Sequence, residues 1–219
     1  MRQTIPWQDA VPPCALRELA IDPRRTALLV VDMQCYGDTP RPVLGANLRL
    51  RDAFRAHDLP VIFLRVGSFL PDARDQHVKR RLSWLRRPGD AEPYVCPLGT
   101  PAYELCEELA PLPTELVLDK NSSGAFNSSP LDHYLRNLGV ENLVITGVST
   151  NHCVDSTARD AADRGYNVIL VDDACNDNDP LAHRATIDSF ARHFGVVRRT
   201  DEVLALLERL LAREPAGAR

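Results

Sequence analysis

The sequence predicts an α/β protein, doubly wound in three α/β/α layers around a mainly parallel sheet of five or six strands. The main observation is that short, β-rich apolar runs alternate along the chain with amphipathic stretches. A second observation is that proline and glycine stand at the expected starts and ends of several of these stretches. Because a helical crossover returns the chain to the sheet in the same direction, this alternation predicts parallel strands.

The domain organisation follows from length and composition. A chain of 219 residues with 44% hydrophobic residues fits one domain with a single core, and it contains no internal repeat or low-complexity linker. We therefore expect one domain over residues 1–219, of which residues 1–23 form an N-terminal extension. The tail after Arg213 is expected to fray.

The first half of the chain contains two predicted strands, at residues 26–31 and 60–66, separated by a predicted helix at 44–57. In the excursion from 67 to 113 the periodicity is poor, proline, arginine and glycine are abundant, and one short helix is expected at 101–109. Long excursions of this kind are usually functional or interfacial. We expect residues 67–113 to form a lid or an interface.

The second half continues the alternation with a third strand at 115–118 and a fourth at 142–146. Between them, Ser129 and Pro130 are expected to be the N-cap and first residue of a helix that ends at Gly139. The later elements are expected in this order: a helix after Gly147 with Val154, Thr157, Ala158, Ala161 and Ala162 facing inward, a strand at 167–171, a helix from Pro180 to Phe194 capped by Asp179, a strand at 196–198 and a helix at 202–211.

Composition argues against several classes of partner. The net charge is −4 and the basic residues are scattered among acidic ones, so we expect no nucleic-acid partner and no membrane partner. The first residues lack a basic segment followed by an apolar one, and the longest apolar runs are strand-sized, which predicts a cytoplasmic location. Six widely spaced cysteines without a C-x-x-C are expected to be reduced: Cys14, Cys35, Cys96, Cys106, Cys153 and Cys175.

Three reactive residues follow predicted strands. Asp32 comes after the first strand, Lys120 after the third, and Cys153 shortly after the fourth. In open parallel sheets ligands bind beyond the carboxyl ends of the strands, so we expect these three side chains to converge. Lys120 is notable because only two of the 26 basic residues are lysine, the other being Lys79.

The chemistry of these residues points to an activated thiol nucleophile. A cysteine in the first turn of a helix meets the positive end of the helix dipole, which favours the thiolate, and a nearby ammonium at Lys120 acts in the same direction. A carboxylate at Asp32 can accept the proton of Cys153 and return it to a leaving amine. Each residue also has a simpler explanation: buried packing for Cys153, a helix or turn cap for Asp32, and a surface position for Lys120.

The sequence resembles the isochorismatase-like cysteine hydrolases in three blocks: TALLVVDMQ, LDKNSSGAF and ITGVSTNHCVDSTARDAADRGYNVILVDDAC. It is most similar to the branch of N-carbamoylsarcosine and maleamate amidohydrolases, and this similarity extends into the following residues, ACNDNDPLAH. The resemblance covers roughly residues 24–200. The resemblance implies that Cys153 is the nucleophile, Asp32 the proton-transfer group and Lys120 its ion partner. It also implies a cis peptide before Ser149, with the backbone N–H groups of Ser149 and Cys153 forming an oxyanion hole.

Substrate contacts are expected from five further residues: Gln34, Tyr36, Phe126, Asn151 and His152. The segment DMQCYGDT departs from the family pattern close to Cys35 and Tyr36. Zinc-containing relatives carry D-x-H soon after the second strand, whereas this chain has RVGSF there and its D-x-H only at residues 75–77, with no second histidine at ligand spacing. We therefore expect no metal and no other cofactor.

The predicted function is hydrolysis of a C–N bond in a small amide, carbamoyl or ureido compound through an acyl-enzyme on Cys153. Two alternatives are an isochorismatase-type vinyl-ether hydrolase, which would lack the cysteine nucleophile, and a non-catalytic ligand-binding protein on the same scaffold. Redox sensing by Cys153 would need Cys35 or Cys175 as a resolving thiol. The expected partners are a small-molecule substrate and a second copy of the chain, in a homodimer or homotetramer.

Overall fold

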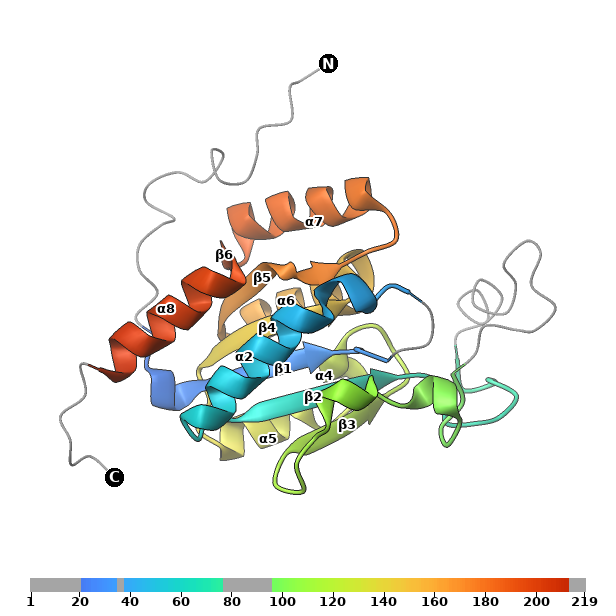
Figure 1. Cartoon of the computed structure of the whole chain (residues 1–219). Coiled ribbons are helices and arrows are strands. Elements are labelled where there is room, and N and C mark those ends of the chain that lie inside the picture. The colour runs from blue at the N-terminus through green and yellow to red at the C-terminus, as the bar shows by residue number, and fades with distance from the viewer. Residues whose placement is uncertain (1–20, 35–37, 77–95, 213–219) are drawn as a thin grey trace, which may run out of the picture.

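A six-stranded sheet in the order β3-β2-β1-β4-β5-β6 forms the centre of the computed structural model, which describes residues 21–34, 38–76 and 96–212 (Figure 1). Every neighbouring pair of strands is parallel, which confirms the predicted sheet. The strands are β1 (Thr26–Val31), β2 (Val61–Val66), β3 (Leu116–Lys120), β4 (Asn142–Val148), β5 (Asn167–Asn176) and β6 (Val196–Arg198).

Helices cover both faces of this sheet and give the three predicted layers. They are α2 (Leu44–Ala56), α4 (Ala125–Ser128), α5 (Leu131–Asn137), α6 (Asp155–Asp163), α7 (Pro180–His193) and α8 (Thr200–Leu211). The core is split by the sheet into two clusters: one contains residues of α4, α5, α6 and α7, and the other residues of α2 and α8. Alternate residues of β1 enter the two clusters, with Leu29 and Val31 in the first and Leu28 and Val30 in the second.

The central strands are continuous apolar runs because both of their faces are covered. All six residues of β1 and all seven of β4 are buried. The helix α7 begins where the sequence predicts, since the Asp179 side chain accepts hydrogen bonds from the N–H groups of Leu181 and Ala182. Small residues let α6 lie close to the sheet, and Thr157, Ala158 and Ala161 are fully buried there.

The expected helix at 101–109 is wrong. The chain instead forms two short 3-10 turns, η4 (Pro101–Tyr103) and η5 (Glu107–Leu109). Between these turns Leu105 pairs with Gln34 in an isolated antiparallel bridge, and the Cys106 N–H donates to the Met33 carbonyl at 2.8 Å. Backbone hydrogen bonds to the segment after β1 thus replace those that a helix would form within itself.

The predicted N-cap at Ser129 is also wrong. The Ser129 hydroxyl donates back to the Ala125 carbonyl at 2.7 Å and so closes the short helix α4, while α5 starts after Pro130 without a side-chain cap. A hydroxyl that bonds to the preceding turn is not available to the following helix. The predicted end of α5 is confirmed, because Gly139 has a φ of +67°.

Several expectations lie outside the described residues. These are the N-terminal extension to residue 20, Cys14, Cys35, Tyr36, His77 and the tail from residue 213. The described part of the 67–113 excursion consists of residues 67–76 and 96–113. In the part of the chain with described structure, no helix combines the length and apolar character needed to cross a membrane.

Candidate active site

The strand order reverses between β1 and β4, and this is where the predicted site lies. From β1 the chain proceeds outward through β2 to β3, then returns to β4 and proceeds the other way through β5 to β6 (Figure 1). Neighbouring loops leave in opposite directions at such a point and open a crevice beyond the strand ends. Asp32 directly follows β1, and the turn that carries Cys153 directly follows β4.

Asp32 stands at a sharp bend in the backbone. Its φ is +50°, in the left-handed region that aspartate tolerates better than most residues. Its N–H still donates to the Leu64 carbonyl at 3.0 Å, as the last link to β2, while its own carbonyl accepts from the Gln34 N–H at 2.7 Å. The carboxylate is therefore held at the end of the strand, and Asp32 is 5% exposed.

Lys120 reaches Asp32 across the intervening strand. Lys120 ends β3, Asp32 follows β1, and β2 lies between them, a separation of roughly 10 Å between strand axes. The Lys120 Nζ donates to the Asp32 Oδ2 at 2.8 Å and to the Ser122 carbonyl at 3.1 Å. The side chains are 0% and 4% exposed, so the pair is isolated from solvent. A buried ion pair with additional hydrogen bonds is the form in which two such charges are tolerated.

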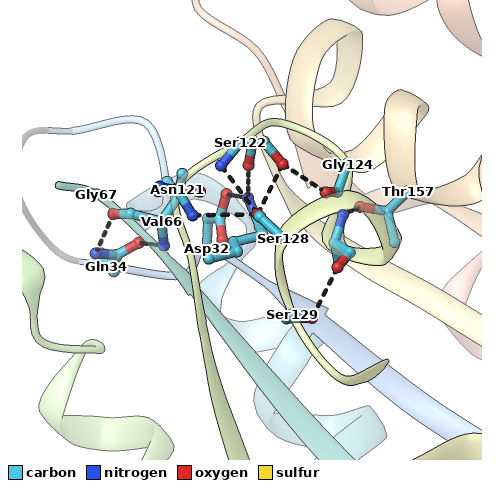
Figure 2. A network of polar contacts seen from close by, with 12 residues as sticks. Asp32, Gln34, Val66, Gly67, Asn121, Ser122, Gly124, Ser128, Ser129 and Thr157 are labelled. Atoms are coloured by element: carbon cyan, nitrogen blue, oxygen red, sulfur yellow. Dashed lines mark hydrogen bonds and ion pairs between the residues drawn. The ribbon is translucent and has the colours of Figure 1, made fainter. Parts of the chain in front are cut away.

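A network of serine hydroxyls holds the loop after Lys120 (Figure 2). The Ser122 and Ser128 hydroxyls are 2.7 Å apart, and the Ser128 Oγ accepts the N–H groups of Asn121 and Ser122, both at 3.2 Å. The Ser122 hydroxyl also donates to the Gly124 carbonyl at 2.9 Å. These bonds fix the carbonyl of Ser122 that accepts from Lys120.

The turn that carries Cys153 begins with a close approach between two strands. Gly147 has a φ of +114°, and a Cβ there would lie 2.0 Å from the Val31 carbonyl oxygen, so only glycine fits. The next peptide, Val148–Ser149, is cis as the family resemblance implies. Cys153 then lies in the π-helical turn η6 (Thr150–Val154) and is 5% exposed.

The nucleophile turn differs from the expected first turn of an α-helix. In η6 the Ser149 carbonyl accepts the N–H groups of both His152, at 3.1 Å, and Val154, at 3.3 Å. π-helical turns of this kind are frequent at functional sites. The sequence offered no sign of the wider turn, because it arises from backbone geometry and not from residue type.

Gln34 braces the site from the side of β2. Its Nε2 donates to the carbonyls of Val66, at 3.0 Å, and Tyr103, at 2.8 Å, and its Oε1 accepts the Val66 N–H at 2.8 Å. Both amide hydrogens are thus used by main-chain carbonyls, which leaves only a lone pair of Oε1 for a substrate. Figure 2 shows Gln34 beside the end of β2.

Phe126 does not lie where a substrate contact was expected. Its ring centroid is 6.0 Å from that of Tyr166, and the Arg164 guanidinium lies 4.8 Å from the ring centroid. Both neighbours come just before β5 starts, at the opposite end of the sheet from Asp32. The position of Phe126 supports a packing role and does not support a contact with substrate.

Asn151 and His152 lie in η6, next to Cys153. The Asn151 N–H donates to the Asp177 Oδ2 at 3.1 Å, and its side-chain Oδ1 is buried with no hydrogen-bond partner within the described segments. His152 is exposed. Both placements are compatible with contacts to a substrate, and these contacts stay predictions. Tyr36, the remaining expected contact, lies outside the described residues.

The cysteines correct the expectation of uniformly reduced thiols. Cys106 is disulfide-bonded and is buried next to the segment after β1. Burial and then the charge of Asp32 raise the pKa of Cys96 to about 11, so this thiol stays protonated at neutral pH. Burial raises the pKa of Cys175 strongly, which makes it a poor resolving thiol for Cys153.

Asp75 belongs to a part of the site that sequence reasoning missed. The sequence singles out Asp75 only as the first residue of a D-x-H motif, yet its carboxylate accepts from the Ser68 hydroxyl, from the Phe69 N–H at 2.9 Å and from the Asn121 amide at 3.4 Å. Burial raises the pKa of Asp75, but these hydrogen bonds outweigh it and the pKa lies below its ordinary value of 3.8. Asp75 thus ties the start of the excursion to the loop after Lys120.

Replacing Asp75 by asparagine should weaken the fold mainly above pH 4. Because the folded pKa is depressed, the stabilisation is complete above 3.8 and is lost as the pH falls through the folded value. We expect the Asp75→Asn variant to melt at a lower temperature than wild type at pH 7, and the difference between the two melting temperatures to shrink as the pH is lowered below 3.8. Thermal denaturation across this range measures the effect, with the exposed Asp58→Asn change as a control. Parallel curves for wild type and Asp75→Asn would contradict this account.

Within the described segments, no group of three or more histidine, cysteine, aspartate or glutamate side chains is arranged to hold a metal ion. The pair itself consists of a carboxylate and an ammonium, and the ammonium also donates to the main-chain carbonyl of Ser122. This donor set is suited to proton transfer and charge balance beside a thiol.

Comparison with known proteins gives a consistent assignment. The isochorismatase domain family matches residues 26–202. The chain is 32% identical to the ureidoacrylate amidohydrolase RutB of Methylobacterium radiotolerans, over 94% of this chain and 88% of that protein.

Among solved structures, a cysteine hydrolase from Pseudomonas syringae pv. phaseolicola has a TM-score of 0.77 and 28% identity, covering 87% of this chain and 95% of its own. The N-carbamoylsarcosine amidase from Thermoplasma acidophilum has a TM-score of 0.66 and 28% identity, covering 81% and 97%. With a family match over most of its length and a parallel sheet that agrees with these structures, the chain belongs to the isochorismatase family.

Proposed function

We propose that this protein is an amidohydrolase that cleaves the C–N bond of a small amide, carbamoyl or ureido compound through a thioester on Cys153. The enzyme class is that of hydrolases acting on carbon–nitrogen bonds other than peptide bonds. The observation that carries the proposal is the buried Lys120–Asp32 pair at the reversal of the strand order, beside the turn that bears Cys153.

The first half of the proposed reaction forms the thioester. The Cys153 Sγ attacks the carbonyl carbon of the substrate while Asp32 takes the thiol proton, and the carbonyl oxygen becomes an oxyanion. The backbone N–H groups of Ser149 and Cys153 stabilise this oxyanion. When the C–N bond breaks, the electron pair stays on nitrogen, Asp32 returns the proton to it, and the amine or ammonia leaves.

The second half hydrolyses the thioester. Asp32, again ionised, takes a proton from an incoming water, the hydroxide attacks the acyl carbon, and the thiolate of Cys153 leaves and recovers the proton. Lys120 keeps Asp32 ionised between the steps, because a second negative charge beside the thiolate would otherwise favour a protonated carboxyl group.

The substrate class rests on the relatives. Ureidoacrylate and N-carbamoylsarcosine, which appear in the names of two of them, both carry a carbamoyl group on nitrogen. We therefore propose that a carbamoyl or ureido compound is the preferred substrate. The cytoplasmic location, the homo-oligomer and the absence of a cofactor stay predictions.

Release of ammonia from a panel of amides, carbamoyl and ureido compounds tests the activity, and mass spectrometry of protein quenched during turnover tests the thioester. We expect ammonia from at least one carbamoyl or ureido compound and an acyl adduct on the peptide that contains Cys153. Turnover without any adduct, together with cleavage of a vinyl ether, would instead identify an isochorismatase-type enzyme. No turnover across both panels would indicate a ligand-binding protein.

A further inference from the structure

Three hydrogen-bonded side chains next to the turn that carries Cys153 form a second polar network, the Thr150–His183–Asp172 network. The Thr150 hydroxyl and the His183 Nδ1 are 2.8 Å apart, and the His183 Nε2 is 3.0 Å from the Asp172 Oδ1. Thr150 begins η6, His183 lies in α7 and Asp172 lies in β5, so the network joins three elements. α7 packs against both η6 and β5 (Figure 1).

The proton positions in this network follow from which of its groups can donate a hydrogen bond. A carboxylate only accepts hydrogen bonds, so the His183 Nε2 donates to Asp172. In the neutral imidazole this leaves Nδ1 as an acceptor, and the Thr150 hydroxyl donates to it. The orientation of the Thr150 side chain is thereby set by the carboxylate of Asp172 through the imidazole of His183.

Thr150 is the buried end of this network. Thr150 is fully buried, whereas the side chains of His183 and Asp172 are 22% and 19% exposed. Thr150 thus has no surface to offer a ligand, and it is three residues from Cys153 and adjacent to Ser149. A second carboxylate supports the same turn, because Asp177 accepts the Asn151 N–H at 3.1 Å.

We propose that Asp172, His183 and Thr150 are positioning residues for the nucleophile turn, and that they hold the Ser149 and Cys153 N–H groups where the oxyanion develops. This inference rests on the proposed function for its kinetic consequence. The physical reason is that η6 makes the widened hydrogen bonds of a π-helical turn and is therefore not fixed by regular α-helical bonds alone. Anchoring its first side chain to β5 and α7 supplies the missing rigidity.

The kinetic signature follows from where the donors act. Oxyanion donors bind the charge that develops in the transition state, so their displacement lowers kcat and leaves KM nearly unchanged. Removing one oxyanion donor outright costs about 100- to 1,000-fold in kcat. Loosening the turn displaces the donors without removing them, so we expect a loss on the order of 10-fold.

Thr150→Val and Thr150→Ser form the first test. Valine keeps the shape of threonine and removes the hydroxyl, whereas serine keeps the hydroxyl, so we expect kcat to fall in Thr150→Val and to be retained in Thr150→Ser. Tyr166→Phe is the matched control, because it removes the hydrogen bond from the hydroxyl of the buried Tyr166 to the Asp132 carboxylate, 2.9 Å long, at the other end of the sheet. We expect its thermal stability to fall while its kcat stays at the wild-type value.

His183→Leu tests whether the three residues of the network act as a unit. It removes both hydrogen bonds of the imidazole, so we expect its kcat to match that of Thr150→Val, and the double variant to lose no more than either single one. Multiplied losses in the double variant would overturn the proposal. So would a wild-type kcat in Thr150→Val, or an equal loss of kcat in Tyr166→Phe.

A reaction that needs no substrate distinguishes failure of this inference from failure of the proposed function. Alkylation of Cys153 by iodoacetamide, followed by mass spectrometry of its peptide, reports on the turn directly. We expect slower alkylation in Thr150→Val than in Thr150→Ser, because displaced N–H groups support the thiolate less well. Equal rates would overturn the positioning role even if amides are hydrolysed, and a difference would support it even if no substrate is found.

Discussion

Replacing Cys153 by alanine should abolish amide hydrolysis while the protein stays folded. The substitution removes the sulfur that forms the thioester. Among the free thiols that the structure describes, neither of the other two can replace it, since burial raises the pKa of Cys96 to about 11 and raises that of Cys175 strongly. Loss of a nucleophile costs on the order of 10⁴-fold or more in kcat. Truncation of a small side chain in the core is expected to cost only about 1 kcal/mol in stability.

Cys153→Ser is the second arm of this test. It preserves size, but a hydroxyl holds its proton far more firmly than a thiol, so the carboxylate of Asp32 cannot generate the nucleophile and activity should also be lost. Cys175→Ala is the matched control, because that thiol lies in the same core cluster and is expected to be dispensable. Ammonia release and thermal denaturation are measured for all three variants. Activity above about a tenth of wild type in either Cys153 variant would contradict the thioester mechanism.

Replacing Lys120 by methionine should lower both activity and stability. Methionine keeps the apolar stem and removes the charge, so Asp32 is left as a buried carboxylate without its cation. Breaking a buried ion pair by removing one partner typically costs about 3–5 kcal/mol. The carboxylate can reduce this cost by taking up a proton, but a protonated Asp32 cannot accept the proton of Cys153. We expect a large fall in kcat and slower alkylation of Cys153 by iodoacetamide at neutral pH.

Lys120→Arg is the sharper test of the same residue. Arginine keeps the charge, but its planar guanidinium does not fit a fully buried site that is shaped for an ammonium bound to Asp32 and the Ser122 carbonyl. We expect activity to fall nearly as far as in Lys120→Met. Lys79→Arg is the control, because Lys79 is the only other lysine and stands beside two arginines in the sequence. Full activity and an unchanged alkylation rate in Lys120→Arg would remove Lys120 from the mechanism.

The sequence by itself determined the sheet and the chain positions of the reactive residues. The runs that form β1 and β4 are apolar on both faces, so they fit a sheet that is covered on both sides. The start of α7 is also local, because the Asp179 side chain caps it. The positions of Asp32, Lys120 and Cys153 relative to the strands follow from the same local patterns. Parallel topology then brings those strand ends to one edge of the sheet.

Only the tertiary structure decided which groups around these residues interact. The bond between Thr150 and His183 joins residues 33 positions apart, and the Gln34–Tyr103 bond spans 69 positions, so no local pattern encodes either of them. The predicted helix at 101–109 does not form for the same reason. Leu105 and Cys106 make their backbone pairing with the segment after β1. Local propensity is a matter of a few tenths of a kcal/mol to about 1 kcal/mol per residue, and a buried long-range hydrogen bond that would otherwise be left unmade outweighs it.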